Sequence, residues 1–173
     1  MQSRRNFIRW SALSLPLLSI SKAFSKNLNN TVTKPIVVST WDSGLPVNAV
    51  AWTVLKQPTG RALDAVEAGA RSIEDTINCC VGIGGNPDRD GKVTLDACIM
   101  DDKFNCGSVM ALEHIKHPIS VARKVMENTP HVQLVGDGAL QFALASGFQK
   151  EPDVLSADAD KAYKQWLKKS EYK

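Results

Sequence analysis

Apolar positions recur along most of the chain with the spacing of buried strands or amphipathic helices. The run PIVVSTW, residues 35–41, is rich in β-branched side chains and predicts a buried strand. The helical period of the apolar residues that follow predicts helices over 46–56 and 61–75. Gly44 and Gly60 interrupt these patterns, so three separate elements are expected in this part of the chain.

The second half of the chain alternates in the same way. Two strand-like runs, 93–101 and 105–112, flank the polar turn Asp101-Asp102-Lys103 and predict a hairpin. Ser156 is placed to cap a final amphipathic helix. The other expected elements, in chain order, are a helix over 117–130, a short strand within 131–138, a helix over 139–148 and the final helix over 156–172.

Alternating strands and helices predict the fold class α/β or α+β. Only three or four strands are expected beside several helices, and so small a sheet would leave a face or an edge uncovered. The sequence therefore has the pattern of part of a larger fold. No apolar run approaches the ~20 residues that span a bilayer, which excludes a multi-span membrane protein.

The first 33 residues have a different character from the rest. Residues 3–9, SRRNFIR, precede an apolar stretch of about a dozen residues, the order found in secretory signals. Arg4 and Arg5 before Asn-Phe-Ile resemble the bacterial twin-arginine signal, and cleavage is expected after Ser25. We therefore expect a signal and short linker over 1–33, one domain over 34–173, and a periplasmic or secreted protein.

The positive net charge belongs to this leader. Four of the 21 basic residues lie within residues 1–25, so the remaining 17 face 18 acidic residues. The sequence pI of 8.7 is consequently no sign of nucleic-acid binding, and no nucleic-acid partner is expected.

Four cysteines occur, at positions 79, 80, 98 and 106, and no C-x-x-C spacing is present. A zinc site is therefore not expected. Cys98 lies in an apolar strand and is expected to be a buried thiol. Cys80 could pair with Cys98 or Cys106 after export, and neighbouring cysteines rarely bond each other, so the sequence leaves the disulfide pairing open.

Two further segments suggest metal sites but do not complete them. His114 and His117 lie three residues apart, but Pro118 interrupts the helix there, and surface histidines are expected. Residues 86–93, NPDRDGKV, match the start of an EF-hand loop, but Ala97 stands where the bidentate Glu is required. The same segment departs from the P-loop spacing. No metal and no cofactor are expected.

The glycines at positions 82, 84 and 85 stand in the string VGIGGNPDRDG. Their backbone can take a positive φ and approach another group closely, or they can form a plain turn. The spacing alone favours neither.

Five stretches of the chain together resemble one known family. They resemble glycosylasparaginase, the N4-(β-N-acetylglucosaminyl)-L-asparaginase family of N-terminal-nucleophile (Ntn) hydrolases, in family order over nearly all of residues 34–173. Similarity to plant-type asparaginases is weaker and is concentrated in the TPHV…GDGA segment. The stretches are PIVVSTW, GRALDAVEAGAR, VGIGGNPDRDGKVTLDACIMD, GSVMALEHIKHPISVARKVMENTPHVQLVGDGALQFA and WLKKSEYK.

The resemblance implies a four-layer αββα fold made as one self-cleaving precursor. In the family, the β-chain begins with the catalytic threonine within an H-D-T-I-G-M-like string, and this sequence lacks that string. The resemblance therefore implies the α-chain portion, with no catalytic residue in this chain and no activity alone. A β-chain partner, an (αβ)2 assembly and a small-molecule asparagine derivative as substrate are implied as well.

The resemblance also implies roles for particular residues. Trp41 matches the tryptophan that lines the substrate pocket, the alternative being an ordinary core residue. Gly82, Gly84 and Gly85 match the loop that approaches the nucleophile, and Cys80 precedes this loop. Two departures stand out: Ser43 replaces a frequent aromatic residue, and Cys80, a weak donor, replaces the usual serine.

Two other interpretations remain. The chain could be a truncated, non-catalytic remnant of such an enzyme, or a relative of the plant-type asparaginases and β-aspartyl peptidases.

Overall fold

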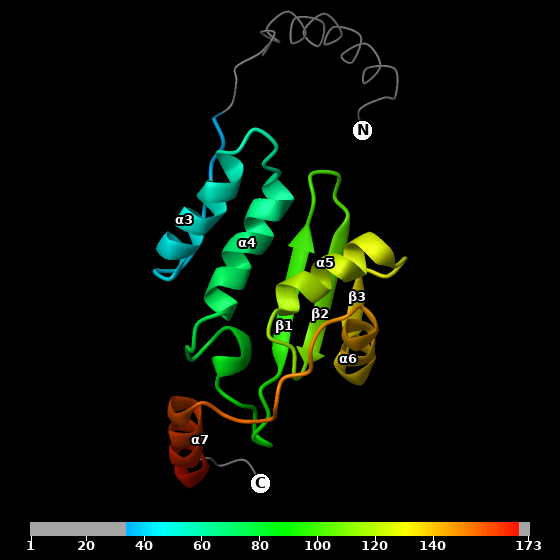
Figure 1. Ribbon diagram of the computed structural model, residues 1–173. Coiled ribbons are helices and arrows are strands. Elements are labelled where there is room, and N and C mark those ends of the chain that lie inside the picture. Colours follow the sequence, from blue (N-terminus) through cyan, green and yellow to red (C-terminus); the bar gives the residue numbers. More distant parts are fainter. Residues whose placement is uncertain (1–33, 170–173) are drawn as a thin grey trace, which may run out of the picture. The chain divides into compact units, whose positions relative to one another are not determined.

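A small mixed sheet organises residues 34–169, the part of the chain that the computed structural model describes (Figure 1). Strand β1 (Leu95–Met100) pairs antiparallel with β2 (Cys106–Leu112), which confirms the predicted hairpin. The short strand β3 (Gln133–Val135) pairs parallel with β2, so the strand order is β1-β2-β3. The mixed α/β class is therefore confirmed. The predicted signal over 1–33 lies outside the described residues.

The helices follow the predicted order with bounds shifted by a few residues. Pro118 occupies the first turn of α5, where its missing N–H costs no hydrogen bond. Gly147, beyond the end of α6, has φ +90°, a conformation that suits the glycine expected to stop that helix. The helices are α3 (Gly44–Leu55), α4 (Ala62–Glu74), the 3-10 turn η1 (Gly82–Gly84), α5 (Pro118–Asn128), α6 (Gly136–Ala145) and α7 (Ala157–Lys169).

The core lies between the sheet and α5. Val109 and Leu112 on β2 and Val121 and Val125 on α5 are completely buried. The alternation of a strand places Val109 on the inner face and its neighbour Met110 on the outer face. Burial of each such side chain stabilises the fold by roughly 1.5–3 kcal/mol, so this interface holds the helices on the sheet.

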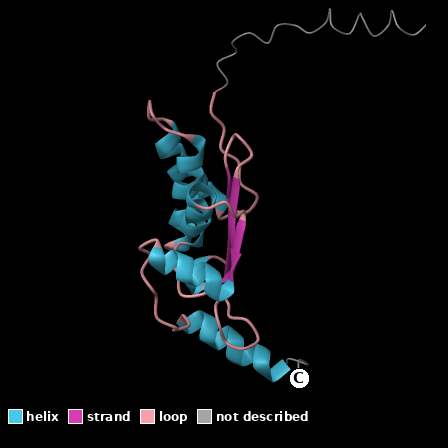
Figure 2. Ribbon diagram, turned by 90° about the vertical axis from the view of Figure 1, so that its right-hand side faces the viewer, coloured by secondary structure: helices cyan, strands magenta, loops and turns pink. Residues whose placement is uncertain are grey.

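The outer face of the sheet is not covered by any described element. Figure 2 shows the helices on one side of the strands only. Met100, Met110 and Val135 are exposed on this face, with 58%, 45% and 57% of their surface accessible. Cys98 is also exposed there, so its expected burial is wrong, because its strand position points away from α5. The expectation that the sheet would leave a face uncovered is confirmed.

The strand predicted over 35–41 does not form. The described part of this segment has no strand pairing, and Ile36 and Val38 are 80% and 82% exposed. A strand requires a neighbour that takes up its backbone hydrogen bonds, and none of the described residues pairs with it. The prediction of a buried strand over 35–41 is therefore wrong.

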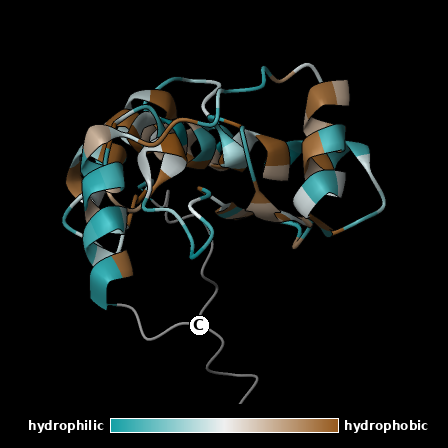
Figure 3. Ribbon diagram, turned by 90° about the horizontal axis from the view of Figure 1, so that it is seen from below, coloured by the Kyte–Doolittle hydropathy of each residue, from teal (hydrophilic) through white to brown (hydrophobic). Residues whose placement is uncertain are grey.

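The last helix, α7, is mostly hydrophilic, as its colours in Figure 3 show. The Ala159 N–H donates to Ser156 Oγ at 3.2 Å, which confirms the predicted cap. Tyr163 donates its hydroxyl hydrogen to the Arg89 carbonyl at 2.9 Å and ties α7 to the polar segment after η1. Within residues 34–169 no helix combines the length and apolarity needed to cross a membrane.

Candidate functional site

The residues singled out by the resemblance lie at one end of a helical pair. Helices α3 and α4 pack side by side in opposite directions, joined by a short connection (Figure 1). Trp41 precedes α3, and the glycine loop, residues 82–85, follows α4. The start of α3 and the end of α4 are adjacent, so this topology brings both segments to the same end of the pair.

The glycine loop is packed against backbone, which decides between the two readings of its glycines. Gly82 has φ +70°, and a Cβ there would lie 2.8 Å from the Glu74 carbonyl oxygen. A Cβ on Gly84 would lie 2.9 Å from the Asn78 nitrogen. Backbone atoms cannot move aside as a flexible side chain can. These two positions therefore require glycine for close approach as well as for turning.

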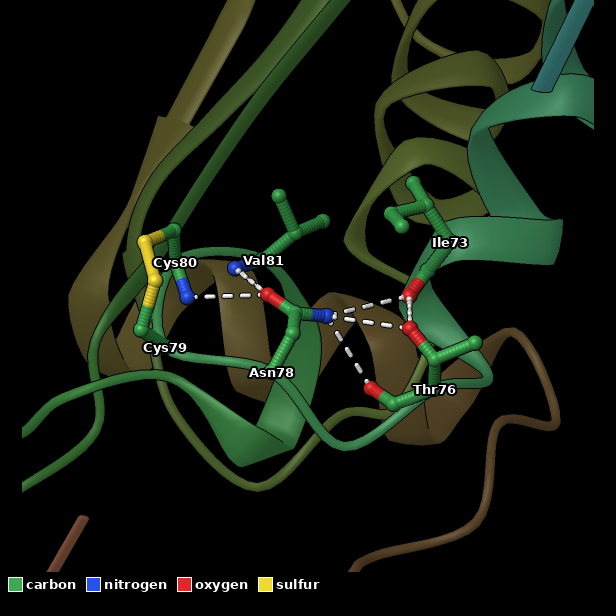
Figure 4. Close-up of a disulfide and its surroundings, with 6 residues drawn as sticks. All are labelled: Ile73, Thr76, Asn78, Cys79, Cys80 and Val81. Atoms are coloured by element: carbon green, nitrogen blue, oxygen red, sulfur yellow. Dashed lines mark hydrogen bonds between the residues drawn. A yellow bond between two sulfur atoms is a disulfide. The ribbon is translucent and has the colours of Figure 1, made fainter. Parts of the chain in front are cut away.

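The segment before the loop is held by the side chain of Asn78 (Figure 4). Its Oδ1 accepts hydrogen bonds from the Cys80 and Val81 N–H groups, at 2.8 and 2.7 Å. Its Nδ2 donates to the Thr76 carbonyl and hydroxyl oxygens, both at 3.1 Å. One amide side chain thus links the end of α4 to the entrance of the loop.

The loop is also closed at its base. The Asn86 N–H donates to the Cys79 carbonyl at 2.8 Å, and the Gly85 N–H donates to the Gly82 carbonyl at 3.0 Å. These hydrogen bonds bring residues 79 and 86 together, so the glycine loop is closed at its base and packs on the end of α4.

Cys79 and Cys80 form a disulfide at this base (Figure 4). The sequence left the pairing open and treated a bond between neighbours as rare, whereas the structure joins the neighbours. Cys98 and Cys106 carry free thiols. The Cys80 sulfur therefore has no S–H to donate in this state, which removes even the weak hydrogen bond considered for that position.

Glu74 lies directly beneath the glycine loop, and its side chain is only 4% exposed. Its Oε1 accepts the Ile119 N–H at 3.1 Å, and its Oε2 lies 3.2 Å from His117 Nδ1. Burial raises the pKa of Glu74 to about 7, although the hydrogen bond from Ile119 and the charge of Arg71 oppose this. The carboxyl group is consequently poised between its neutral and charged forms near neutral pH.

His117 is not the surface residue that was expected. Its side chain is 13% exposed and stands between Glu74 and Asp75, whose Oδ1 lies 3.5 Å from Nε2. Burial and the positive charge of Arg71 lower the pKa of His117, so the neutral imidazole is favoured. The side chain of His114 is likewise only 17% exposed. Proximity to α4, which the chain order does not reveal, explains the burial of His117.

Arg123 ties α5 to α4 through several carboxylates. Its Nη2 lies 2.7 Å from Asp64, its Nη1 2.6 Å from Glu67 and its Nε 2.8 Å from Glu127. Burial opposes the charge, but these hydrogen bonds together raise the pKa of Arg123 above its usual value. The cluster ties α5 to α4, since Asp64 and Glu67 both lie on α4 and accept from the same guanidinium.

Trp41 lies on the surface of the described part of the chain. Its side chain is 70% exposed, so it is not a core residue within the described part of the chain. The predicted role as pocket wall stays a prediction, because no substrate is present.

The EF-hand-like segment has an explanation without a metal. Asp88 Oδ1 accepts the N–H groups of Asp90 and Lys92, each at 2.9 Å, which organises a tight turn. Among residues 34–169, no group of three or more His, Cys, Asp or Glu side chains gathers closely enough to hold a metal ion.

Sequence reasoning missed Asn78 and the Glu74–His117 pair. A signal for Glu74 was present: it lies four residues after Ala70, on the predicted apolar face of the helix, where a charged group needs a partner. Asn78 offered only the general preference of asparagine for turns.

Comparison with known proteins supports the resemblance. The asparaginase family model, described as "Asparaginase", matches residues 29–173. An N(4)-(Beta-N-acetylglucosaminyl)-L-asparaginase of Elizabethkingia miricola is 55% identical over 99% of this chain and 52% of its own length. The rat protein of that name is 43% identical over 79% of this chain and 39% of its length. A plant-type L-asparaginase of Thermococcus kodakarensis is 44% identical over 68% of this chain and 38% of its length.

These matches establish the class: a chain of the Ntn-hydrolase asparaginase family. The chain belongs to the glycosylasparaginase family, as its motifs predicted. It spans about half or less of the length of these relatives.

Proposed function

We propose that this chain is the α-chain portion of an exported N4-(β-N-acetylglucosaminyl)-L-asparaginase, an amidohydrolase that cleaves the side-chain amide of glycosylated asparagine. The observation that carries the proposal is the uncovered sheet face in a chain that matches about half of an enzyme so named. A β-chain packed on that face would bury Met100, Met110 and Val135 and complete a second layer.

In the proposed assembly the β-chain supplies the chemistry. Its N-terminal threonine uses its own α-amine as the base that activates the hydroxyl. The hydroxyl attacks the amide carbon of the substrate, the amine leaves, and water hydrolyses the resulting ester. An internal serine or threonine of this chain has no free amine, so this chain alone is proposed to be inactive, and assembly as (αβ)2 is proposed for the complete enzyme.

The contribution proposed for this chain is the shape of the pocket. Trp41 would provide an aromatic wall. Its high exposure is consistent with this role, because an exposed ring is free to contact a substrate or the β-chain. The glycine loop would stand beside the nucleophile on a base fixed by Asn78 and Glu74. Ser43, also exposed, would leave that wall thinner than an aromatic residue would.

We favour glycosylated asparagine over the substrates of plant-type asparaginases, because the relative named as a glycosylasparaginase matches more of this chain. The Elizabethkingia miricola relative matches 99% of this chain, whereas the Thermococcus kodakarensis plant-type enzyme matches 68%.

An assay with and without a β-portion tests the proposal. The chain from residue 26 onward would be expressed alone, and also together with the part of the Elizabethkingia miricola relative that this chain does not match. Both preparations would be assayed with asparagine, N4-GlcNAc-asparagine and a β-aspartyl dipeptide. We expect no turnover by the chain alone and hydrolysis of N4-GlcNAc-asparagine by the pair. Turnover by the chain alone would overturn the assignment of roles, and no turnover by a stable pair would favour a non-catalytic remnant.

Export is proposed from the Arg4-Arg5 motif and the short apolar stretch that follows it. Replacing both arginines by lysine should hold a fused, folded reporter in the cytoplasm. Unchanged delivery through the twin-arginine route would contradict the proposal.

A further inference from the structure

We propose that the Cys79–Cys80 disulfide is a redox-active site that undergoes thiol–disulfide exchange with dithiol reductants. The redox state of this disulfide sets the conformation of the glycine loop. The proposal concerns the loop itself and does not depend on the proposed amidase activity. It is carried by the place of the bond in the chain, its exposure, and the hydrogen bonds anchored on its ring atoms (Figure 4).

The position of the bond argues against a stapling role. A disulfide stabilises a fold mainly by closing a loop and restricting the unfolded chain, and the effect grows with the length of that loop. Cys79 and Cys80 are adjacent, with Cα atoms 3.7 Å apart, so their bond closes no loop and links no separate elements. Its contribution to overall stability is therefore small.

The bond is open to exchange. Both cysteines are exposed, at the surface after α4. Exposed disulfides are the ones that thiolates reach, and they are typically the labile ones, whereas structural disulfides resist reduction. An incoming dithiol therefore meets this bond without prior unfolding of the chain.

The ring formed by the bond contains the backbone atoms that hold the loop. Besides both sulfurs and both Cβ atoms, it includes the Cys79 Cα and carbonyl carbon and the Cys80 nitrogen and Cα. The Cys79 carbonyl oxygen, attached to a ring atom, accepts the Asn86 N–H. The Cys80 nitrogen, itself a ring atom, donates to Asn78 Oδ1.

Oxidation consequently fixes the directions of both hydrogen-bonding groups. Cys79 ψ and Cys80 φ are torsions within the ring, so they cannot turn freely while the bond is intact. Reduction opens the ring and releases both torsions. The base of the glycine loop then depends on Asn78 and Asn86 alone, and we expect it to open more often.

The exchange step balances with a dithiol as reductant. One thiolate of the dithiol attacks one cysteine sulfur, the Cys79–Cys80 bond breaks, and a mixed disulfide forms. The second thiol of the reagent then attacks the reagent sulfur that is bonded to the cysteine in the mixed disulfide, and the cysteine is released as a thiol. The reagent leaves as a cyclic disulfide, and its two electrons and two protons remain on Cys79 and Cys80 as thiols.

Trypsin separates this site from the other thiols, which makes it directly measurable. Cleavage after Arg71 and Arg89 yields peptide 72–89, which contains Cys79 and Cys80 only. Cys98 and Cys106 fall in peptides 93–103 and 104–116. The purified chain would be treated with increasing dithiothreitol, alkylated with N-ethylmaleimide and digested, with circular dichroism recorded at each step. We expect peptide 72–89 to gain two labels while the native helical signal is retained.

Amide hydrogen exchange would report on the loop under the same conditions. Reduction should accelerate exchange at the Asn86 and Cys80 amides by about fivefold or more, because the hydrogen bonds they donate are weakened. In the double variant Cys79→Ser/Cys80→Ser, the amide exchange rates should match those of the reduced protein and should not change with dithiothreitol. The variant Cys98→Ser/Cys106→Ser should respond as the unsubstituted chain does.

Three results would each overturn the proposal. They are free thiols in peptide 72–89 from protein purified in air, a bond that persists until the circular dichroism signal is lost, and exchange at Asn86 that reduction does not change. If the loop responds and the paired enzyme is nevertheless inactive in both redox states, the proposed function fails and this inference stands.

Discussion

The two faces of the β1–β2 hairpin differ in how completely this chain covers them. On the inner face, Val109 and Leu112 are fully buried against α5. On the outer face of the same strands, Met100 and Met110 remain 58% and 45% exposed. Both sets of side chains come from the same two strands, and a register shift between the Ala97–Val109 and Leu95–Leu112 pairs brings Leu112 to the same face as Val109. The helices of this chain complete one layer, and the other layer lacks a cover among the described residues.

The polar groups of the helical side reinforce this contrast. Glu74 and Arg123, both largely buried between α4 and α5, have hydrogen-bonded partners. No buried side-chain nitrogen or oxygen in the described part of the chain is left without a partner. Unsatisfied buried polar groups are costly, so their absence is what a finished interior requires. The buried polar groups of the helical side are thus satisfied within the chain, whereas the outer face of the sheet exposes apolar side chains that an interface could bury.

The largest expected effect separates the two faces directly. Leu112→Ala should lower the free energy of unfolding by about 2–5 kcal/mol, because it removes buried methyl groups and leaves a cavity. Met110→Ala, two residues away and on the outer face, should cost less than about 1 kcal/mol in the same chain. Urea denaturation followed by circular dichroism measures both. Equal losses would show that the outer face is packed in solution, and the contrast would then fail.

A pH series on Glu74 tests the completeness of the helical side. An ordinary glutamate releases its proton near pH 4.5, whereas Glu74 in the folded chain holds it to about pH 7. Between these values the folded state binds more protons, so the stabilising contribution of Glu74 is complete below about pH 4.5 and is lost by about pH 7. Glu74→Gln has no proton to lose and should gain about 3 kcal/mol relative to the unsubstituted chain across that window.

The titration of His117 has to be separated from that of Glu74. Its lowered pKa acts in the opposite direction, stabilising the fold above the ordinary value of 6.5 and less as the pH falls. Because His117 contacts Glu74, the comparison is made in a His117→Asn background, in which only Glu74 of the pair titrates. A difference in unfolding free energy that stays constant from pH 4.5 to pH 7 would show that Glu74 is solvated.

The smallest expected effect concerns the close approach of the glycine loop to Glu74. Gly82→Ala should destabilise the chain by about 1–2 kcal/mol from the positive φ alone, with a further cost from the Glu74 carbonyl. Gly138 lies in α6, and a Cβ added there would meet no other atom within 4 Å. Gly138→Ala should therefore stabilise the chain by up to about 1 kcal/mol. Thermal unfolding of both variants measures the contrast. A Gly82→Ala variant as stable as the unsubstituted chain would mean that the loop does not pack on α4.

Local patterns predicted the elements well because strands and helices follow from the spacing of apolar residues. The β1–β2 hairpin and the α5 helix beginning at Pro118 appear where expected. The strand over 35–41 failed, since an apolar run indicates a need for burial but cannot supply the neighbour that would pair with it. The prediction for Cys98 is wrong for a related reason: Cys98 shares the outer face of its strand with Asp96 and Met100, and none of the described elements covers that face.

The candidate site was predictable only in part. Resemblance located the glycine loop, and the structure adds that Gly82 is required by contact with Glu74. The Glu74–His117 contact joins residues 43 positions apart, so it depends on how α4 and α5 pack, which no local pattern contains. The Cys79–Cys80 bond joins neighbouring cysteines, which rarely bond each other, so the sequence pattern did not predict it.

The reactivity of the Cys98 thiol tests the central claim most directly, because this residue is exposed on the uncovered face of the sheet. The chain would be alkylated with N-ethylmaleimide alone and in complex with the β-portion of the Elizabethkingia miricola relative, and peptide 93–103 would be followed by mass spectrometry. The account predicts that the two parts co-purify and that Cys98 reacts readily in the free chain and slowly in the complex. Equal reactivity in a co-purified complex, or no association at all, would contradict it.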